Sequence, residues 1–499
     1  MPKVLSAKQI KELDAYTIQH EPIASIDLME RACRAFESWF TERFDVTHRI
    51  GIVCGTGNNG GDGLGIARLL YESGYNVHVW IVKGDATESI DFKINQDRLR
   101  NKVAIAEITL KCDQDIFSSC DILIDAIFGS GLSRAPEGLY AKAIDCINQT
   151  NALRIAVDVP SGLMMDRSSE GSIVKAHHTV SFQLPKQAFF LPQCYPFVGT
   201  WSVVPIGLNK DFIKQASTPY SCVSLKDVKR ILKPRLTFDH KGRYGHALII
   251  AGSIGKIGAS VLASRASLRA GLGLLTVHIP KCGNTILQTA VPEAMASIDK
   301  NEEFLTSIEN TDQYSSIGIG PGLGQHPETV KAFASVLAQF KLPMVIDADA
   351  LNILSANKEL MNHIPQGSIL TPHPKEFERL VGSWKDDFER LEKQQQLAKQ
   401  LKCVVVLKGA YSSIASPEGD VYFNSTGNPG MATGGSGDVL TGILTGLLAQ
   451  HYSPLEAAKL GAYLHGLSGD MAAYEKGVNS LIASDLIEFL PAAFKKITS

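Results

Sequence analysis

The 499-residue sequence lacks a long apolar run, and its two signs of charge nearly cancel. No run reaches the roughly 18 residues that a membrane-spanning helix needs, so we expect no transmembrane segment. With a formal charge of −2, the chain has no excess of positive charge that would attract nucleic acid or an anionic membrane. The first residues, MPKVLSAKQIKELD, lack the apolar core of a signal peptide and are typical of a helix start.

Paired cysteines are also absent. The nine cysteines are an odd number, and no two of them have CxxC spacing. This excludes a simple disulfide framework and the common zinc motifs, so we interpret them as buried thiols of a protein in a reducing compartment, which predicts a cytoplasmic location. They are Cys33, Cys54, Cys112, Cys120, Cys146, Cys194, Cys222, Cys282 and Cys403.

What the sequence does have is a series of short apolar runs, each followed by glycine, proline, aspartate or histidine. Hydrophobic residues make up 44% and charged residues 20%, enough for large buried cores. Runs at 50–55, 75–82, 121–129 and 154–162 alternate with helical patterns such as 65–73, and a second series begins at 246–253. Such alternation predicts parallel sheets wound on both faces, with ligands bound beyond the carboxyl ends of the strands.

The pattern loosens between residues 208 and 235. We therefore predict a boundary near 215–224 and two domains, 1–218 and 224–499. The fold class is α/β, with two doubly wound domains, of which the first is a Rossmann-like parallel sheet.

The first chemical motif is GTGNNGGDG at 55–63, between a predicted strand and a predicted helix. Glycines allow close backbone approach, and free amides at a helix start attract phosphate. A tight turn without a ligand is the alternative. Asp125 and Asp158 follow two later strands; with Asn59 and Ser161 they offer hard oxygen ligands for a cation, although either aspartate could instead cap a helix.

These segments resemble the NAD(P)H-hydrate epimerase family, the YjeF N-terminal domain. The resemblance rests on LMERA at 28–32, GTGNNGGDGLGIARLL at 55–70, DAIFGSGL at 125–132 and DVPSGL at 158–163. It implies an enzyme that interconverts the R and S epimers of the hydrated nicotinamide ring, and a potassium ion held by Asn59, Asp125 and Ser161. The implied substrate-binding residues are Asn58, Asn59, Gly60, Gly61, Asp62, Gly129, Ser130, Gly131, Leu132, Ser133, Arg134, Ala135 and Asp158.

Epimerisation requires transient loss and regain of an oxygen substituent, or an equivalent ring opening, so one group must exchange protons near neutral pH. Asp158 is our catalytic candidate. Lys186 is a weaker one, because a lone lysine in a loop is usually solvated. Cys33 stands where the family usually has glycine, which we expect to affect packing only.

The strongest motif is NPGMATGGSGDVLTG at 428–442. The GGSG amides at a helix start would form an anion hole for a migrating phosphate, and Asp438 could take a proton from a substrate hydroxyl. The pattern resembles the GxGD signature of ribokinase-like kinases, and it is not a Walker loop because no GK[ST] follows. An aspartate that only caps the helix is the alternative.

Other loops of the second series add candidates. Lys408 ends a strand and could meet a nucleotide phosphate or a neighbouring carboxylate, and His373 lies between two prolines. Asp347 and Asp349 could bind Mg²⁺ or cap a helix, and the sequence leaves both open.

Together these segments resemble the ADP/ATP-dependent NAD(P)H-hydrate dehydratase family, the YjeF C-terminal domain, over nearly all of 235–495. The resemblance implies a ribokinase-like α/β/α domain and substrate contacts at Ala259, Gly322, His373 and Asp438. Implied nucleotide contacts are Lys408, Gly409, Ala410, Tyr411, Ser412 and Gly437. Ser412 and Ser436 stand where many members have threonine, and both keep the hydroxyl.

We therefore expect an enzyme that repairs hydrated NAD(P)H. Its first half would epimerise the hydrate, and its second half would phosphorylate the S hydrate with ADP and Mg²⁺ and then eliminate phosphate, with Asp438 as the base. Its partners would be NAD(P)H hydrates and adenine nucleotide, without nucleic acid or membrane, and we expect a homo-oligomer. The alternative is a small-alcohol or vitamin kinase fused to a non-catalytic dinucleotide-binding module.

Overall fold

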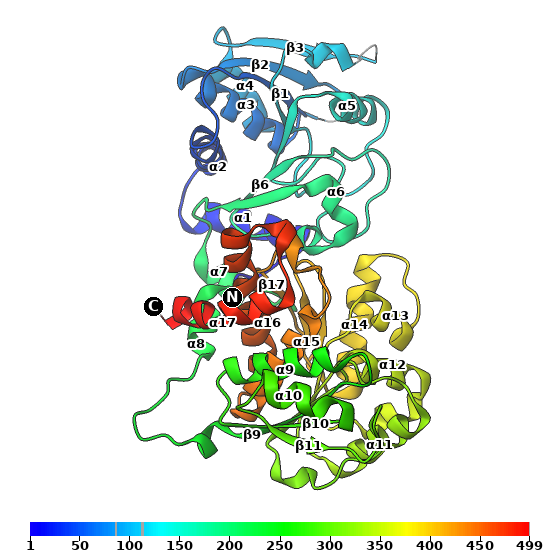
Figure 1. Cartoon of the computed structure of the whole chain (residues 1–499). Coiled ribbons are helices and arrows are strands. Elements are labelled where there is room, and N and C mark those ends of the chain that lie inside the picture. Colours follow the sequence, from blue (N-terminus) through cyan, green and yellow to red (C-terminus); the bar gives the residue numbers. More distant parts are fainter. Residues whose placement is uncertain (85–86, 111–113, 499) are drawn as a thin grey trace. The chain divides into compact units, whose positions relative to one another are not determined.

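The computed structural model describes residues 1–84, 87–110 and 114–498. The chain forms two compact units. One consists of Pro2–Thr218 with Asp386–Phe388, and the other begins at Pro219, contains the rest of the chain and includes Met1 (Figure 1). The strand Tyr220–Val223 belongs to the second unit, ahead of the start that we expected at residue 224.

The N-terminal unit contains a seven-stranded sheet of order β3-β2-β1-β4-β5-β6-β7, in which all paired strands are parallel. The order reverses between β1 and β4, which opens a crevice at their carboxyl ends. The strands are β1 Arg49–Cys54, β2 Asn76–Val82, β3 Ala104–Ile108, β4 Ile122–Ala126, β5 Leu153–Val157, β6 His178–Phe182 and β7 Thr200–Val204. The helices are α1 Ala7–His20, α2 Ser25–Thr41, α3 Asn58–Glu72, α4 Ile90–Leu99, α5 Gly138–Gln149, α6 Tyr195–Val198 and α7 Lys210–Gln215.

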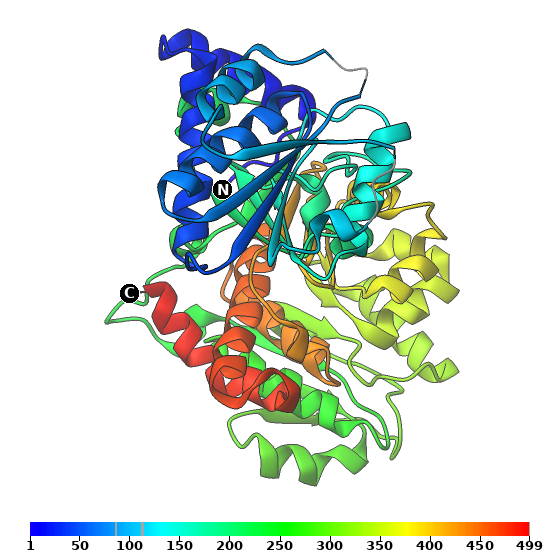
Figure 2. The same cartoon turned by 90° about the horizontal axis from the view of Figure 1, so that it is seen from above.

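Helices cover both faces of this sheet (Figure 2). Gly63 of α3 lies against the side chains of Ile52 and Cys54, whereas α5 shares a core cluster with Val53. Because successive residues of a strand point to opposite faces, α3 and α5 must pack on opposite sides.

Helix α3 begins at Asn58, earlier than the helical segment 65–73 that we predicted, so the glycine-rich motif is itself the first part of a helix. Glycine is a weak helix former, but close packing requires it here. A Cβ on Gly60 would lie 1.8 Å from the carbonyl oxygen of Gly55, and one on Gly61 would lie 2.9 Å from Met29 Sδ. The motif therefore seats α3 tightly against the end of β1.

The C-terminal unit contains a ten-stranded sheet of order β11-β10-β9-β12-β13-β14-β15-β16-β17-β8. Strand β16 is antiparallel to both neighbours, and every other pair is parallel. The strands are β8 Tyr220–Val223, β9 His246–Ile250, β10 Leu274–Ile279, β11 Met295–Ile298, β12 Ser316–Ile319, β13 Met344–Ile346, β14 Ile369–Leu370, β15 Val404–Leu407, β16 Ser413–Ala415 and β17 Val421–Asn424. The helices are α8 Leu225–Ile231, α9 Ile257–Arg269, α10 Asn284–Ala290, α11 Pro327–Gln339, α12 Ala348–Ala356, α13 Pro374–Val381, α14 Asp387–Leu401, α15 Ser436–Ala449, α16 Pro454–Lys476 and α17 Ala483–Thr498.

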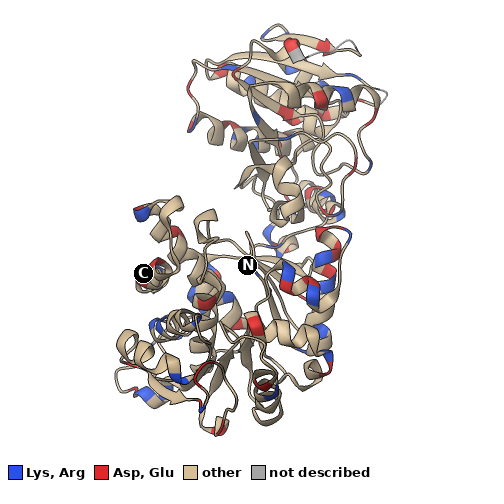
Figure 3. Ribbon diagram, turned by 45° about the vertical axis from the view of Figure 1, so that its right-hand side comes forward, with Lys and Arg blue, Asp and Glu red and all other residues tan. Residues whose placement is uncertain are grey.

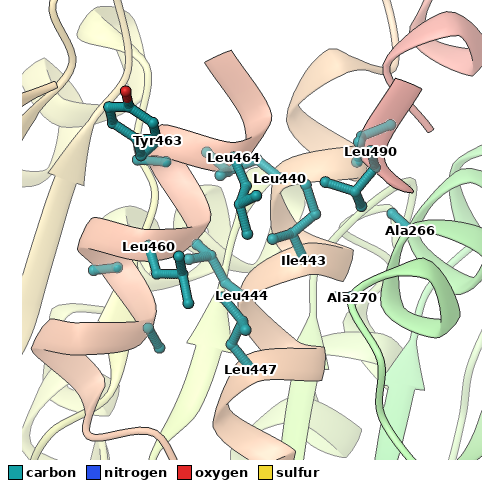
Figure 4. Close-up of a cluster of buried hydrophobic side chains, with 14 of the residues drawn as sticks. Ala266, Ala270, Leu440, Ile443, Leu444, Leu447, Leu460, Tyr463, Leu464 and Leu490 are labelled. Atoms are coloured by element: carbon teal, nitrogen blue, oxygen red, sulfur yellow. The ribbon is translucent and has the colours of Figure 1, made fainter. Parts of the chain in front are cut away.

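Helix α15 lies within a large core cluster of this unit. Its leucines and isoleucine interleave with Leu460 and Leu464 of α16 and face Leu490 of α17 (Figure 4). On the side of α9, a Cβ on Gly442 would lie 2.1 Å from the carbonyl oxygen of Ala263. A helix packed on all sides cannot shift easily, so its first turn, with Asp438, is held in a fixed position.

The prediction of an α/β fold in two units is confirmed. Cys112 lies outside the described residues; the other eight cysteines are free, and all but Cys282 are buried. Acidic and basic residues are interspersed over each unit (Figure 3). Among the described helices, none combines the length and the hydropathy that crossing a membrane would require.

Candidate active sites

A cavity of about 1170 Å³ opens at the carboxyl edge of the N-terminal sheet. It is lined by most of the substrate-binding residues that the motifs predict. Gly60 and Gly61 do not line it, because both are buried against protein atoms. The predicted residues on its wall are Asn58, Asn59, Asp62, Gly129, Ser130, Gly131, Leu132, Ser133, Arg134, Ala135 and Asp158.

Asp158 follows β5 with a φ of +63°, a left-handed conformation that is costly for a residue other than glycine. Its carboxylate is surrounded by donors. Lys186 Nζ lies 3.0 Å from Oδ1, Ser181 donates its hydroxyl to Oδ1 at 3.2 Å, and the Ser130 amide donates to Oδ2 at 3.3 Å. Burial works to raise the pKa of Asp158, but Lys186 and these hydrogen bonds outweigh it and lower that pKa. Asp158 is therefore held in the ionised form.

Lys186 is not the solvated loop lysine that the sequence suggested. Its side chain is 1% exposed, and Nζ donates to the carbonyl oxygens of Phe182 and Leu184 at 3.1 Å each while it pairs with Asp158. The expectation of a solvated lysine was wrong because these carbonyls and the carboxylate replace its water.

The three predicted cation ligands lie close together. Ser161 donates its hydroxyl to Asp125 Oδ1 at 2.6 Å and its amide to Oδ2 at 2.8 Å. The Phe128 amide donates to Ser161 Oγ at 2.8 Å, and the next residue, Gly129, approaches Asn59 so closely that a Cβ would lie 2.8 Å from Asn59 Oδ1. The backbone at 128–129 thus connects Asn59 to the Asp125–Ser161 pair.

This cluster carries an uncompensated charge. Asp125 is fully buried, and no basic side chain of the described residues forms an ion pair with it. Burial raises the pKa of Asp125 to about 6, against the hydrogen bonds from Ser161. The buried Asn59 Nδ2 has no partner among the described residues. A carboxylate, a hydroxyl and nearby carbonyl oxygens without a resident cationic side chain suit a hard cation.

Two further carboxylates face the same cavity: Asp62, within the motif, and Asp14, on α1. Burial and then the charge of Asp158 raise the pKa of Asp14 to about 6, although Lys186 lowers it. Burial, Asp158 and Asp14 together raise the pKa of Asp62 well above its usual range. Our sequence reasoning missed Asp14. The signal was an acidic residue in register with Ile10 and Ile18, on the face of α1 that lines the cavity.

A second cavity, of about 420 Å³, lies in the C-terminal unit. It brings together three predicted substrate contacts from separate segments, Ala259 on α9, Gly322 after β12 and Asp438 on α15. Asp349, Asn352 and Glu376 also line it. Gly322 has a φ of +59°, and a Cβ there would lie 3.2 Å from that of Ala259, so glycine is needed at this close approach.

Asp438 lies in the first turn of α15. Gly435 immediately precedes this helix and has a φ of +89°. The Ser436 amide donates to the Thr433 carbonyl at 3.4 Å, but Gly435 provides no side-chain cap, so the amides of Gly437 and Asp438 remain available to an anion. Burial, followed by the charge of Asp347, raises the pKa of Asp438 to about 6, while Lys408 opposes this shift. A carboxylate with this pKa is mostly ionised at neutral pH and can accept a proton.

Lys408 binds a carboxylate of the protein. Its Nζ lies 2.8 Å from Asp347 Oδ1 and 3.9 Å from Glu376, and Thr441 donates to Asp347 Oδ2 at 2.7 Å. Burial alone would lower the pKa of Lys408, but Asp347 and Glu376 raise it, so the lysine stays charged. Asp347 precedes α12 but makes no capping hydrogen bond. This ion pair adjoins Gly437, where a Cβ would lie 3.3 Å from Lys408 Nζ.

His373 caps the N-terminus of α13 and is not among the residues that line the cavity. Its Nδ1 accepts the Lys375 amide at 3.1 Å, and Glu376 Oε2 accepts the His373 amide at 2.9 Å. Burial lowers the pKa of His373. A neutral ring that accepts a hydrogen bond at Nδ1 carries its proton on Nε2. Because the His373 amide donates to the Glu376 carboxylate, His373 positions Glu376, and Glu376 does line the cavity.

The predicted nucleotide contacts at 409–412 form a turn between β15 and β16. Ser412 Oγ donates to the Gly409 carbonyl at 3.0 Å, and Tyr411 has a φ of +53°. Apart from its chain neighbours, no atom of the described residues lies within 4 Å of a Cβ built on Gly409, so this turn is open on the side of Gly409.

The folds and the sites define an enzyme with two α/β units, each with carboxylates at the edge of its sheet. Comparison with known proteins agrees. A family model described as NAD(P)H-hydrate dehydratase matches residues 247–492, and one described as YjeF-related protein N-terminus matches residues 25–188. The bifunctional NAD(P)H-hydrate repair enzyme Nnr of Moorella thermoacetica is 36% identical over 99% of this chain and 97% of its own length. The enzyme of the same name from Coxiella burnetii is 34% identical over 97% of each chain.

Among solved structures, the ADP/ATP-dependent NAD(P)H-hydrate dehydratase of Bacillus subtilis, co-crystallised with ATP and Mg²⁺, is 34% identical. The match has a TM-score of 0.50 and covers 55% of this chain and 98% of that one. A ribokinase-like superfamily protein from Enterococcus faecalis is 28% identical, with the same TM-score. This chain belongs to the family of bifunctional NAD(P)H-hydrate repair enzymes. The family assignment and the ribokinase-like fold predicted from the motifs are confirmed, and the small-alcohol kinase alternative is not favoured.

Proposed function

We propose that this chain restores NAD(P)H from its hydrates in two steps. The N-terminal unit interconverts the R and S epimers, and the C-terminal unit dehydrates the S epimer with ADP, which yields AMP and phosphate. The observation that carries this proposal is the first turn of α15, where free helix amides and a proton-accepting carboxylate meet at one cavity.

In the C-terminal unit, hydroxide is a poor leaving group, and a phosphate ester is a good one. Asp438 takes the proton of the substrate hydroxyl while the amides of Gly437 and Asp438 stabilise the transferring phosphoryl group. Elimination of phosphate, assisted by the ring nitrogen, then restores the double bond. The Lys408–Asp347 pair keeps a cationic group beside Gly437, which favours the nucleotide phosphates there.

A magnesium ion is compatible with the carboxylates of this cavity. No cluster of three His, Cys, Asp or Glu side chains suited to a metal occurs in the described part of the chain. Mg²⁺ is commonly held by one or two carboxylates together with substrate phosphates, and Asp349 could supply one of them. When bound with the nucleotide, Mg²⁺ would neutralise phosphate charge.

In the N-terminal unit we assign Asn59, Asp125 and Ser161 to a potassium ion. The buried, uncompensated Asp125 carboxylate supports this assignment. The ion would supply the missing positive charge and tie the loop at 128–129 to the start of α3. Substrate would occupy the cavity beside Asp158. Self-association and a cytoplasmic location stay predictions.

The test uses the full chain and separated epimers. With the S epimer and ADP, we expect stoichiometric phosphate and recovery of dihydronicotinamide absorbance. With the R epimer and no nucleotide, we expect conversion to the S form only. Phosphorylated substrate without absorbance recovery would support a kinase and overturn the dehydratase. If the R form does not convert faster than it does without protein, the epimerase is overturned.

A further inference from the structure

The large cavity of the N-terminal unit contains four ionisable groups whose surroundings differ sharply. Asp14, Asp62, Asp158 and Lys186 all line it. Two of them, Asp158 and Lys186, are paired with each other at 3.0 Å. The other two, Asp14 and Asp62, form no hydrogen bond or ion pair with the described residues through their carboxylates. Sites with carboxylates in contrasting surroundings separate the roles of acid and base.

Asp158 is poorly placed to exchange a proton. Lys186, the Ser181 hydroxyl and the amide of Phe182 are directed at Oδ1, and the amide of Ser130 is directed at Oδ2. A proton on Oδ1 would have to displace one of its donors, and protonation of either oxygen would remove the negative charge that pairs with Lys186. The same contacts hold the carboxylate ionised, which suits a group that stabilises positive charge on the substrate.

Asp14 has the opposite surroundings. It lies one turn from Ile10 and one turn from Ile18 on α1, a helix whose start is fixed by a capping box between Ser6 and Gln9. The helix therefore presents an unpaired carboxyl group to the cavity in a fixed position. The charged groups that face Asp14 are Asp62 from α3, Asp158 after β5 and Lys186 before the 3₁₀ turn Gln187–Phe190, with Asp91 from α4 and Lys11 from its own helix also on the wall.

We infer that Asp14 is the residue that gives and takes the proton during epimerisation, beside a permanently ionised Asp158. This inference rests on the proposed epimerase function. Asp62 is the competing candidate on geometry alone. Burial and the charges of Asp158 and Asp14 raise the pKa of Asp62 well above the usual range and favour its protonated form, whereas Asp14, with a pKa of about 6, exists in both forms near neutral pH.

The step balances without a co-reactant. Asp14 protonates the hydroxyl oxygen on the hydrate carbon, the carbon–oxygen bond breaks, and the lone pair of the ring nitrogen forms a carbon–nitrogen double bond as water leaves. Water then adds to the other face of that carbon, the electron pair returns to nitrogen, and the released proton returns to Asp14. Asp158 stabilises the cationic ring between the loss of water and its re-addition.

The experiment compares Asp14→Asn with a matched control on the same helix, Glu12→Gln, whose side chain is exposed. Conversion of the R epimer by the full chain is followed chromatographically without nucleotide. We expect Asp14→Asn to lower kcat by about 10²–10⁴-fold, the usual contribution of general acid–base catalysis, with a small change in KM. Glu12→Gln should retain the wild-type rate. ADP-dependent dehydration of the S epimer should be unchanged in both, which shows that the chain is folded.

The pH profile and one more variant separate this role from a structural one. The wild-type rate should fall as pH rises through the pKa of Asp14, because the protonated form becomes scarce. Asp14→Glu should keep that limb with reduced activity, and Asp14→Asn should lose it. Epimerisation by Asp14→Asn at the wild-type rate overturns the inference, as does a loss of activity confined to Asp62→Asn. A wild-type chain without epimerisation overturns the proposed function instead.

Discussion

Replacing Asp438 by asparagine tests the C-terminal site, because the structure predicts opposite effects on activity and stability. The substitution keeps the shape of the side chain and removes the proton-accepting group. We expect the turnover of S-hydrate dehydration to fall by about 10²–10⁴-fold. Epimerisation of the R hydrate by the other unit should be unaffected.

The stability change follows from the raised pKa. The pKa of Asp438 is about 6 in the folded chain and 3.8 in the unfolded chain. Below about pH 4 the group is mostly protonated in both states, so it costs the folded state little stability. The folded state loses stability as pH rises from about 4 to about 6, because the unfolded chain ionises first, and the penalty is constant above pH 6. At about 1.4 kcal/mol per pKa unit, the penalty at neutral pH is at most about 3 kcal/mol. The lost attraction to the helix N-terminus offsets about 0.3–1 kcal/mol of this.

Asp438→Asn should therefore be more stable than the wild type at pH 7.5, by a few degrees in the melting temperature of this unit. At pH 4 the difference should vanish. The wild-type rate should also fall as pH drops below about 6, since the base becomes protonated. Asp312→Asn, at an exposed position of a 3₁₀ turn, is the matched control and should change neither quantity. Near-wild-type dehydration by Asp438→Asn would refute the assignment of the base, and a lower melting temperature would refute the account of its pKa.

Three further substitutions test other parts of the structure. Lys408→Ala leaves Asp347 buried without its partner, so we expect a loss of about 3–5 kcal/mol in a denaturant titration; an unchanged midpoint would contradict the ion pair. Gly60→Ala places a methyl group against the Gly55 carbonyl, so the N-terminal unit should lose its folded near-ultraviolet circular dichroism; a native spectrum would show that the backbone can move apart. Potassium should raise the melting temperature of the wild-type N-terminal unit more than lithium does, and Asp125→Asn should abolish that difference; equal effects of both salts on the wild type would count against the cation site.

Local signals made much of this structure predictable. A strand followed by a glycine-rich turn and a helix is encoded within a dozen residues, so the positions of the 55–63 and 428–442 motifs at sheet edges followed from the sequence. The family resemblance rested on the same local segments. The extent of α3 was misjudged because glycine content argues against a helix, whereas contacts with Gly55 and Met29 favour it.

Contacts between distant segments were not predictable. Lys408 and Asp347 are 61 positions apart, and no feature of the sequence near either residue indicates that they form an ion pair. Likewise, the burial of Lys186 depends on Asp158 and on the carbonyls around it. Asp14 was missed for a related reason, because an isolated acidic residue in a helix is usually solvated and its role depends on loops that follow much later.

The edge position of β8 has a consequence for biosynthesis. This strand is among the first residues of the C-terminal unit to be translated, yet its partner β17 begins at Val421, which pairs with Tyr220. The ten-stranded sheet therefore cannot be completed until nearly the whole chain has left the ribosome. Most of the N-terminal unit, in contrast, is complete by residue 218. During that interval β8 is an unpaired strand edge. Nascent chains that stall before residue 421 should therefore be the ones most dependent on chaperones.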